Sequence, residues 1–289
     1  DALPISGSDV TITWTTENID ATTAVKIELY NGSSLSATLA NSTANDGSET
    51  VTIDANAAYG TNYKVRVSLA DNANLYSESD AITIVPNITI NKLVTDTAAN
   101  GKSNYENQVV RVKGLVTGIR IYQASCNFTL QGGNNLFNSI YVYYCENGSI
   151  NIGDSVYVEG LVNYSDIFLQ IGKSASHSQG TIICRGNNLP QPTIVSLSDI
   201  KKKAYFNKVV KIENIIITSK QGDAYIGKVD PISSDSISIY NNLFTQKMNL
   251  KTNRKYDITA AVGYRSSAKT KYELWPRTKD TTAVIYIGG

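Results

Sequence analysis

The sequence predicts an all-β protein in which a two-sheet sandwich is followed by two small barrels. Short segments of alternating apolar and polar residues recur along the chain, and turn signals such as Asn31-Gly32 separate them. A motif that begins at Tyr105 recurs at Tyr205, which indicates an internal repeat. Thr, Ser, Asn and Tyr are abundant while only 18% of residues are charged, a mixture that suits strands with one face in water.

Residues 1–86 are predicted to form the sandwich. Short strands with turns between them and no helical period indicate two packed sheets. Only six residues precede the Gly7-Ser8 turn, so the first strand is expected to be short or absent and to leave an unpaired sheet edge. The expected strands are residues 10–15, 25–30, 35–39, 51–53, 63–67 and 82–85.

Four stretches of this region carry a family resemblance. They are Gly7-Ser8-x-Val10-Thr11-Ile12-Thr13-Trp14, Val25-Lys26-Ile27-Glu28-Leu29-Tyr30, Asn45-Asp46-Gly47-Ser48 and Tyr63-Lys64-Val65-Arg66-Val67. With them, residues 1–86 resemble the immunoglobulin-like domain of the yeast cell-wall glucan-synthesis and Ser/Thr-rich GPI-anchored family, which is common also in secreted bacterial proteins. The resemblance implies a non-catalytic wall or surface module.

The repeat predicts a duplicated domain. Tyr105-x-Asn107-x-Val109-Val110 aligns with Tyr205-x-Asn207-x-Val209-Val210, and Val162 and Tyr164 match Val262 and Tyr264 at the same offset. A constant offset over such a length argues for duplication. The expected domains are therefore residues 87–189 and 190–289.

Each copy is predicted to be an OB-like five-stranded barrel. The first copy has a long strand over 108–121, bent at Gly114 and Gly118, then a hairpin and two more strands, which is the order of an OB barrel. The hairpin and the two later strands are residues 127–131 with 139–144, 155–162 and 167–171. Short helical segments are expected before residue 104 and over 200–205. The strands of the second copy are residues 208–219, 224–229, 236–240, 256–264 and 271–275.

Two motifs link these copies to known domains. Gly153-Asp154-Ser155-Val156 and the segment 272–280 resemble OB-like domains of secreted Bacteroidota lipoproteins and extracellular nucleases. The resemblance implies the fold and leaves the ligand open. After the second barrel one more β-prone segment, residues 282–287, is expected.

The three cysteines lie in residues 87–189. Pairing Gln131 with Ile140 in the hairpin also places Cys126 opposite Cys145, within reach of a disulfide. We expect that bridge, with Cys184 free or an alternative partner, and three buried thiols remain the other interpretation. A bridge would indicate an oxidising compartment, and six Asn-x-Ser/Thr sequons fit an exported protein.

No catalytic constellation is found, and no enzyme activity, metal or cofactor is predicted. The single histidine, His177, lies in a polar loop and lacks the sequence context of a triad or a zinc site. The cluster Asp71-Asn72-Ala73-Asn74, with Glu78 and Asp80, offers oxygens for calcium, but an ordinary Asx turn explains it better. No run of eighteen apolar residues exists, so no membrane span is expected.

One function hypothesis is a secreted binding module for single-stranded nucleic acid or polysaccharide, which could be an accessory part of a larger secreted hydrolase. OB domains bind single strands by combining a basic groove with stacking aromatic side chains. The second copy interleaves both residue types. The candidates are Tyr225, Tyr240, Arg254, Lys255, Tyr264, Arg265, Lys269, Lys271 and Trp275.

The leading hypothesis is a structural subunit of an extracellular or cell-surface assembly. Residues 1–86 hold three bases and eleven acids, a net −8, whereas residues 190–289 hold sixteen bases and eight acids, a net +8. Such a gradient favours head-to-tail contact with other copies. The terminal segment could donate a strand to the open edge of the next sandwich, and repeated donation would form a filament. The candidate donor residues are Thr282, Ala283, Val284, Ile285, Tyr286 and Ile287.

Overall fold

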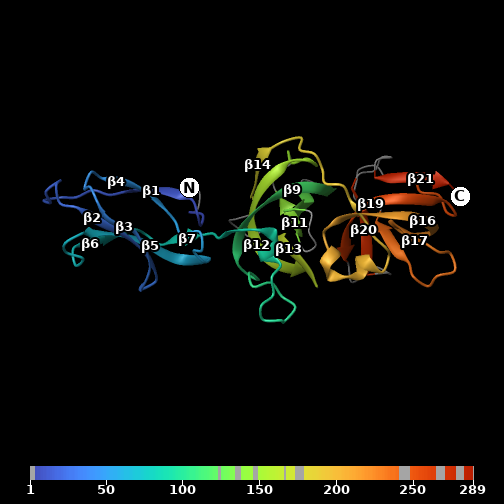
Figure 1. The fold of residues 1–289 in the computed structure, drawn as a ribbon, viewed down its shortest axis with the longest axis horizontal. Helices are drawn as coiled ribbons and strands as arrows, with labels where there is room; N and C mark the ends of the chain where they lie inside the picture. Colours follow the sequence, from blue (N-terminus) through green and yellow to red (C-terminus); the bar gives the residue numbers. More distant parts are fainter. Residues whose placement is uncertain are drawn as a thin grey trace. The chain divides into compact units, whose positions relative to one another are not determined.

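The computed structural model describes residues 4–122, 125–133, 138–145, 149–165, 167–172, 179–240, 248–264, 271–277 and 283–288. Its contacts divide the chain into two compact units: Asp1–Asn87 with Val109–Arg111, and Ile88–Gln108 with Val112–Gly289. The predicted all-β class is confirmed, because strands dominate both units (Figure 1). No helix among the described residues is long and apolar enough to cross a membrane.

The first unit is an immunoglobulin-like sandwich, as predicted. One sheet has the strand order β3-β2-β5-β6, with β7 also paired to β5, and the other contains β1 and β4. Alternation explains the core: Ile27 and Leu29 of β2 are fully buried and pack with Ile53 and Ile84. The strands are β1 (Asp9–Thr13), β2 (Val25–Asn31), β3 (Ser34–Thr43), β4 (Ser48–Thr52), β5 (Gly60–Leu69), β6 (Tyr76–Glu78) and β7 (Ile82–Ile84).

The opening edge of this sandwich is partly closed. Ile5 forms an isolated parallel bridge with Val85 and is buried, so the residues before Gly7 take the place of a short first strand. They pair with the end of the unit and leave β1 paired only to β4 in the described residues. The expectation of a short first strand and an unpaired edge therefore holds at β1.

The second unit contains two closed barrels of the same topology. In the first barrel the order is β9-β10-β11-β13-β12, and β12 closes onto β9. In the second it is β16-β17-β18-β20-β19, and β19 closes onto β16. In each barrel the third and fourth strands of the path, β11 with β13 and β18 with β20, pair in parallel. The predicted OB-like barrels are confirmed.

The strands of both barrels occur in the predicted order and close to the predicted residues. The first barrel comprises β9 (Val109–Tyr122), β10 (Ser125–Gln131), β11 (Ser139–Cys145), β12 (Ser155–Ser165) and β13 (Phe168–Gly172), with β8 (Asn87–Ile88), α1 (Ile90–Leu93) and β14 (Gln179–Cys184) attached. The second comprises β16 (Val209–Gln221), β17 (Ala224–Lys228), β18 (Ile237–Tyr240), β19 (Lys255–Tyr264) and β20 (Tyr272–Pro276), with β15 (Thr193–Ile194) and β21 (Val284–Gly288) attached. The helix expected over 200–205 is instead two 3₁₀ turns, η1 (Asp199–Lys201) and η2 (Lys203–Tyr205).

The repeated Tyr-x-Asn-x-Val-Val motif builds the same corner in both barrels. Asn107 and Asn207 have φ angles of 63° and 65°, a left-handed conformation that Asn tolerates better than most residues. Their backbone N–H groups donate to the carbonyls of Val162 and Val262, each at 2.9 Å. The motif therefore marks the turn that ties the long first strand to the fourth strand of its barrel.

The interpretation of the terminal segment as a donated strand is wrong for this structure. β21 pairs antiparallel with β19 of its own barrel, from Ile258 opposite Val284 to Lys255 opposite Gly288. Its equivalent in the first barrel is β14, which pairs with β12 in the same way. The segment is thus the last strand of the repeated unit, which explains why it follows the barrel. Thr282 lies outside the described residues.

The predicted hairpin register needs a correction of one residue. Gln131 lies opposite Ser139, not Ile140, and a register shift between Cys126 and Phe128 restores Cys126 opposite Cys145. A bulge, which inserts one extra residue into one strand, accounts for the difference. The side chain of Cys145 lies outside the described part of the structure, so the disulfide itself stays a prediction.

Candidate functional site

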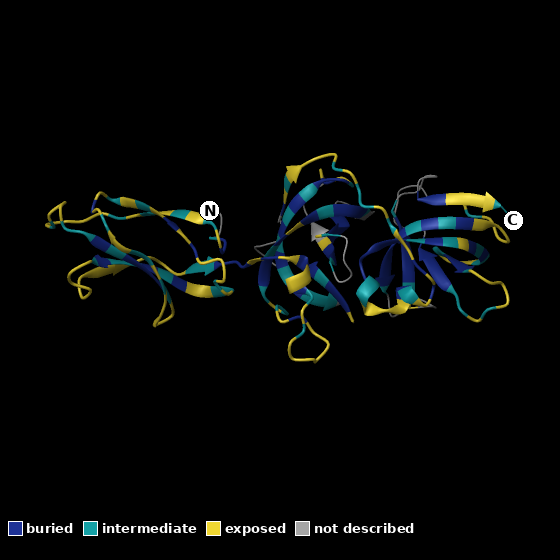
Figure 2. Ribbon diagram, viewed as in Figure 1, coloured by how far each residue is buried: buried dark blue, intermediate teal, exposed yellow. Residues whose placement is uncertain are grey.

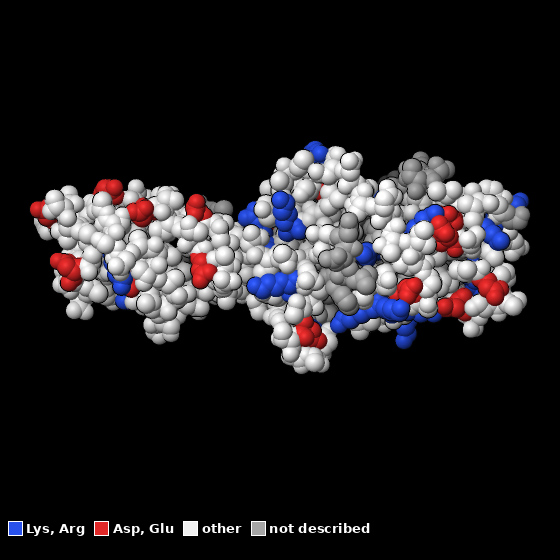
Figure 3. Space-filling view, viewed as in Figure 1, with Lys and Arg blue, Asp and Glu red and all other residues white. Residues whose placement is uncertain are grey.

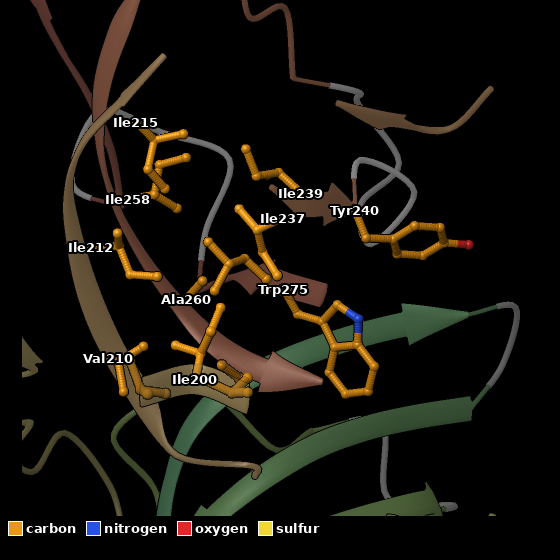
Figure 4. Packing of buried hydrophobic residues seen from close by; sticks show 14 of the residues in the cluster. Ile200, Val210, Ile212, Ile215, Ile237, Ile239, Tyr240, Ile258, Ala260 and Trp275 are labelled. Carbon is orange, nitrogen blue, oxygen red and sulfur yellow. The ribbon is translucent and has the colours of Figure 1, made fainter. Parts of the chain in front are cut away.

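The hydrophobic core of the second barrel extends across the contact with the first barrel to Tyr141 and Phe168. An aromatic cluster lies at the centre: the ring of Trp275 is 5.3 Å from that of Tyr141 and 5.7 Å from that of Phe168, between centroids. Phe206 lies 5.8 Å from Phe168. These distances fall in the range of favourable ring pairs. Figure 4 shows the indole of Trp275 projecting from its own barrel toward the strands of the first. We call this contact the seam.

Trp275 can occupy the seam because its neighbour has no side chain. A Cβ atom built on Gly263 would lie 2.2 Å from the indole ring. In the first barrel the glycine lies on the other strand of the pair, and a Cβ on Gly172 would lie 2.4 Å from the amide of Asn163. Strand registers make Gly172 the equivalent of Trp275 and Asn163 the equivalent of Gly263. The larger side chain of the pair therefore lies on β20 in the second barrel and on β12 in the first.

A cavity of about 290 Å³ lies beside the seam, and two cations line it. Lys208 lies inside the repeated motif, between Asn207 and Val209, and is only 5% exposed. Arg277 follows β20, where its backbone N–H donates to the Thr259 carbonyl at 3.1 Å. The Arg277 Nε is buried and has no hydrogen-bond partner. Gln131, Gln191 and Thr193 add polar side chains to the wall.

Burial lowers the pKa of both cations below their ordinary values, because desolvation disfavours the charged form. A bound anion would reverse this by supplying the opposite charge. A guanidinium presents a planar fork that matches two oxygens of a carboxylate, and an ammonium adds a point charge. The arrangement is therefore suited to hold one compact anionic group.

The aromatic residues predicted to stack on a ligand lie in the core. Tyr225, Tyr240 and Trp275 are 2%, 9% and 9% exposed, so none offers a ring face to solvent. Figure 2 shows buried residues along the strands of both barrels. The Tyr225 hydroxyl donates to the Met248 carbonyl, and Trp275 Nε1 donates to Glu273. Their assignment as stacking residues is wrong, because the faces of these strands that were expected in water point inward.

The predicted basic residues do not meet at one place. Arg254 and Lys255 lie at the start of β19 and Tyr264 at its end, which an extended strand separates by roughly 30 Å. Arg254 donates to the Tyr286 hydroxyl at 3.1 Å, and Lys271 is exposed before β20. Arg265 and Lys269 lie outside the described residues, as does His177.

The calcium candidate is accounted for by local bonds. The Asn72 side chain accepts from the Asn74 N–H, which is an Asx turn. Glu78 is engaged by Arg66 and Lys64. No group of three or more metal-ligating side chains occurs in the described part of the chain.

Sequence reasoning missed Lys208 and Arg277 as site residues. Lys208 lies in the repeated motif and Arg277 in the segment 272–280. A cation at a strand end normally lies in water, so the sequence offers no reason to select either residue. The signal available was that Lys208 replaces Gln108 of the first copy.

Comparisons with known proteins confirm the resemblance of the first unit. Residues 2–84 match the model of the Kre9/KNH-like N-terminal Ig-like domain. No curated protein matches the sequence.

Among solved structures, the chain is similar to a murine DNA-binding protein bound to double-stranded DNA, with 11% identity and a TM-score of 0.31 over 62% of this chain and 99% of that one. It is also similar to the p204 HINb domain, with 11% identity and a TM-score of 0.29 over 56% and 90%. A structure described as structural mimicry for functional antagonism has 10% identity and a TM-score of 0.34 over 65% and 99%. Likenesses at this level carry no argument about function.

Proposed function

We propose that this chain is a non-catalytic binding module of an extracellular or cell-surface protein, and that the cavity beside its seam binds an acidic sugar residue of a polysaccharide. The observation that supports it is the pairing of Lys208 and Arg277 at one cavity of about 290 Å³. Burial disfavours the charged form of both side chains, and a bound anion would stabilise that form. The match of residues 2–84 to a Kre9/KNH-like domain, whose family resemblance implies a wall or surface module, supports the location.

A uronic acid fits this cavity better than a nucleic acid strand does. Single-strand binding uses exposed aromatic faces along a basic groove, and Tyr225, Tyr240 and Trp275 are buried. A uronic acid instead presents one carboxylate whose two oxygens suit the fork of Arg277, and the sugar hydroxyls can bond to Gln131 and Gln191. We therefore assign the acidic glycan to the cavity beside the seam.

The experiment is calorimetric titration of the full chain with tetragalacturonate, with a neutral dextran oligomer and single-stranded oligothymidylate as comparison ligands. Arg277→Gln should weaken tetragalacturonate binding about 10- to 100-fold, because it removes a charge-assisted hydrogen bond. The matched control is Lys271→Gln, which removes an exposed charge just before the same strand and should change affinity less than twofold. Equal effects of the two variants, or preference for oligothymidylate, would reject the assignment.

Head-to-tail assembly remains a second candidate, through strand edges and not through strand donation. β21 is an edge strand, and its residues Ile285, Tyr286 and Ile287 are 42%, 53% and 44% exposed. The visible face of the first unit carries mainly acidic charges, in line with its net −8 (Figure 3). Exposed edges of this kind pair readily with another chain.

Sedimentation of the full chain tests this candidate over a concentration series. Tyr286→Pro removes a backbone donor from β21 and should abolish any self-association, whereas the exposed Tyr76→Pro in β6 should not. A chain that stays monomeric at the highest concentration excludes assembly by this edge.

A further inference from the structure

A second cavity, of about 210 Å³, lies in the same unit and is lined by residues of both barrels. Its walls are mostly hydrocarbon, with Ile140 and Leu169 from the first barrel and Phe206 from the second. Two neutral polar residues, Ser139 and Asn207, also line it and are only 6% and 3% exposed. We call it the Asn207 cavity.

The two polar residues each leave one buried atom unsatisfied. Ser139 Oγ and Asn207 Oδ1 have no hydrogen-bond partner, although buried polar atoms normally have one. The Asn207 Nδ2 donates to the Leu169 carbonyl at 3.5 Å, which leaves Oδ1 as the atom available for another group. Oδ1 can only accept, whereas Ser139 can donate or accept. A hydroxyl group satisfies both, because it also donates and accepts.

The charged side chains that line this cavity already have hydrogen-bond or ionic partners. Lys102 pairs with Glu106 at 2.8 Å, and the Lys203 Nζ donates to the Gly101 carbonyl at 2.9 Å. The Asp96 carboxylate accepts from the N–H groups of Asn100 and Gly101. An ionic ligand would lose its water against Ile140, Leu169 and Phe206 and would have to displace these hydrogen bonds to gain a counter-charge, so the chemistry favours a neutral occupant.

We propose that the Asn207 cavity binds a neutral sugar ring. A volume of about 210 Å³ is below the roughly 300–1,000 Å³ of pockets for drug-sized ligands and matches a single ring. One face of a pyranose is hydrocarbon and packs on Phe206 and Leu169. Its edge carries hydroxyls, which donate to Asn207 Oδ1 and bond to Ser139 Oγ. This site is separate from the anion site of Lys208 and Arg277, and neither proposal needs the other.

The test is saturation-transfer NMR on the full chain with a panel of methyl glycosides of neutral hexoses, and with cyclohexanol as a ring that has a single hydroxyl. We expect transfer to at least one glycoside. Ala204→Leu, which fills the cavity from its wall, should abolish that transfer. Ser139→Ala should weaken binding about tenfold, the effect of one hydrogen bond.

Matched substitutions separate binding from folding. Asn207→Gly and Asn107→Gly replace equivalent left-handed residues, so both should fold, and only the first should lose the glycoside. Arg277→Gln should leave glycoside binding unchanged, which distinguishes this site from the anion site. Absence of transfer from every glycoside, equal binding of cyclohexanol, or unchanged binding in Ala204→Leu would overturn the proposal.

Discussion

The two barrels of the second unit share a topology and differ where they meet. In the first copy Glu106 pairs with Lys102 in water, whereas its equivalent Phe206 is 9% exposed and packs against Phe168 of the other barrel. Gln108 of the first copy becomes the buried Lys208. Trp275 occupies the position of Gly172.

The comparison separates what makes the barrel from what makes the seam. Asn107 and Asn207 keep the same backbone conformation and the same hydrogen bond, so the corner of the fold is retained. The changed residues all face the partner barrel or the cavity beside it. The second copy thus carries the apolar residues and the cations that turn two barrels into one unit with a candidate binding site.

The largest expected effect comes from exchanging the residues of the two copies. Phe206→Glu places a carboxylate in the aromatic cluster and should lower the free energy of unfolding by about 3–5 kcal/mol, the cost of an uncompensated buried charge. Glu106→Phe changes a partly exposed residue and should shift stability by about 0.5 kcal/mol or less. Urea denaturation measures both. Similar losses in the two variants would show that the seam is not the difference between the copies.

The glycines under the seam should respond unequally to an added methyl group. Gly263→Ala places Cβ against the indole of Trp275 and should cost about 1–3 kcal/mol through overpacking. Gly172→Ala meets the end of the Asn163 side chain, which can turn away, and should cost about 1 kcal/mol or less. Thermal unfolding of the two variants decides between them. A larger loss in Gly172→Ala would contradict the packing described for Trp275.

The shared corner should respond equally in both copies. Asn107→Ala and Asn207→Ala force alanine into a left-handed conformation and should each cost roughly 1–2 kcal/mol. The corresponding glycine variants should lose less than the alanine variants. Denaturant midpoints measure this, and a loss confined to one copy would show that the corner is not equivalent.

The smallest expected effect is the pH dependence that comes from Lys208, where the first copy has Gln108. Burial lowers the pKa of Lys208 in the folded state, so the unfolded chain binds more protons in the interval up to the ordinary lysine value of about 10.4. Stability from this residue should therefore rise with pH through that interval, and Lys208→Met should remove the rise. Lys211, whose pKa is raised by Glu213 and Asp257, should give the opposite slope. Denaturation of Lys208→Met and of Lys211→Met across alkaline pH compares the signs of the two slopes.

The sequence predicts the barrels well because both the repeat and the strand alternation act locally. The motif that repeats after one hundred residues contains Asn107 and Asn207. These residues take the left-handed conformation at the corner of each barrel, so this backbone requirement can be recognised in the sequence. The equivalence of β14 and β21 was missed because their offset differs: Cys184 and Gly288 hold matching positions opposite Ser155 and Lys255. The second copy has four more residues than the first between these two positions, so the one-hundred-residue offset does not align β21 with β14.

The site could not be predicted because its residues are distant in the sequence and one of them, Gln131, comes from the other barrel. All four residues of β18, Ile237 to Tyr240, are buried, so alternation gives no sign of which face is wet. Lys208 and Arg277 lie almost seventy residues apart in the sequence. A hairpin of the other barrel completes their cavity, and local pattern carries no information on that pairing.

A crystal structure of the full chain with trigalacturonate bound tests the central claim most directly. We predict one carboxylate within hydrogen-bond distance of Arg277 Nε and Lys208 Nζ, with a sugar hydroxyl on Gln131 or Gln191. A trisaccharide held instead by exposed residues such as Lys271 or Arg254, with the cavity beside the seam unfilled, would contradict it.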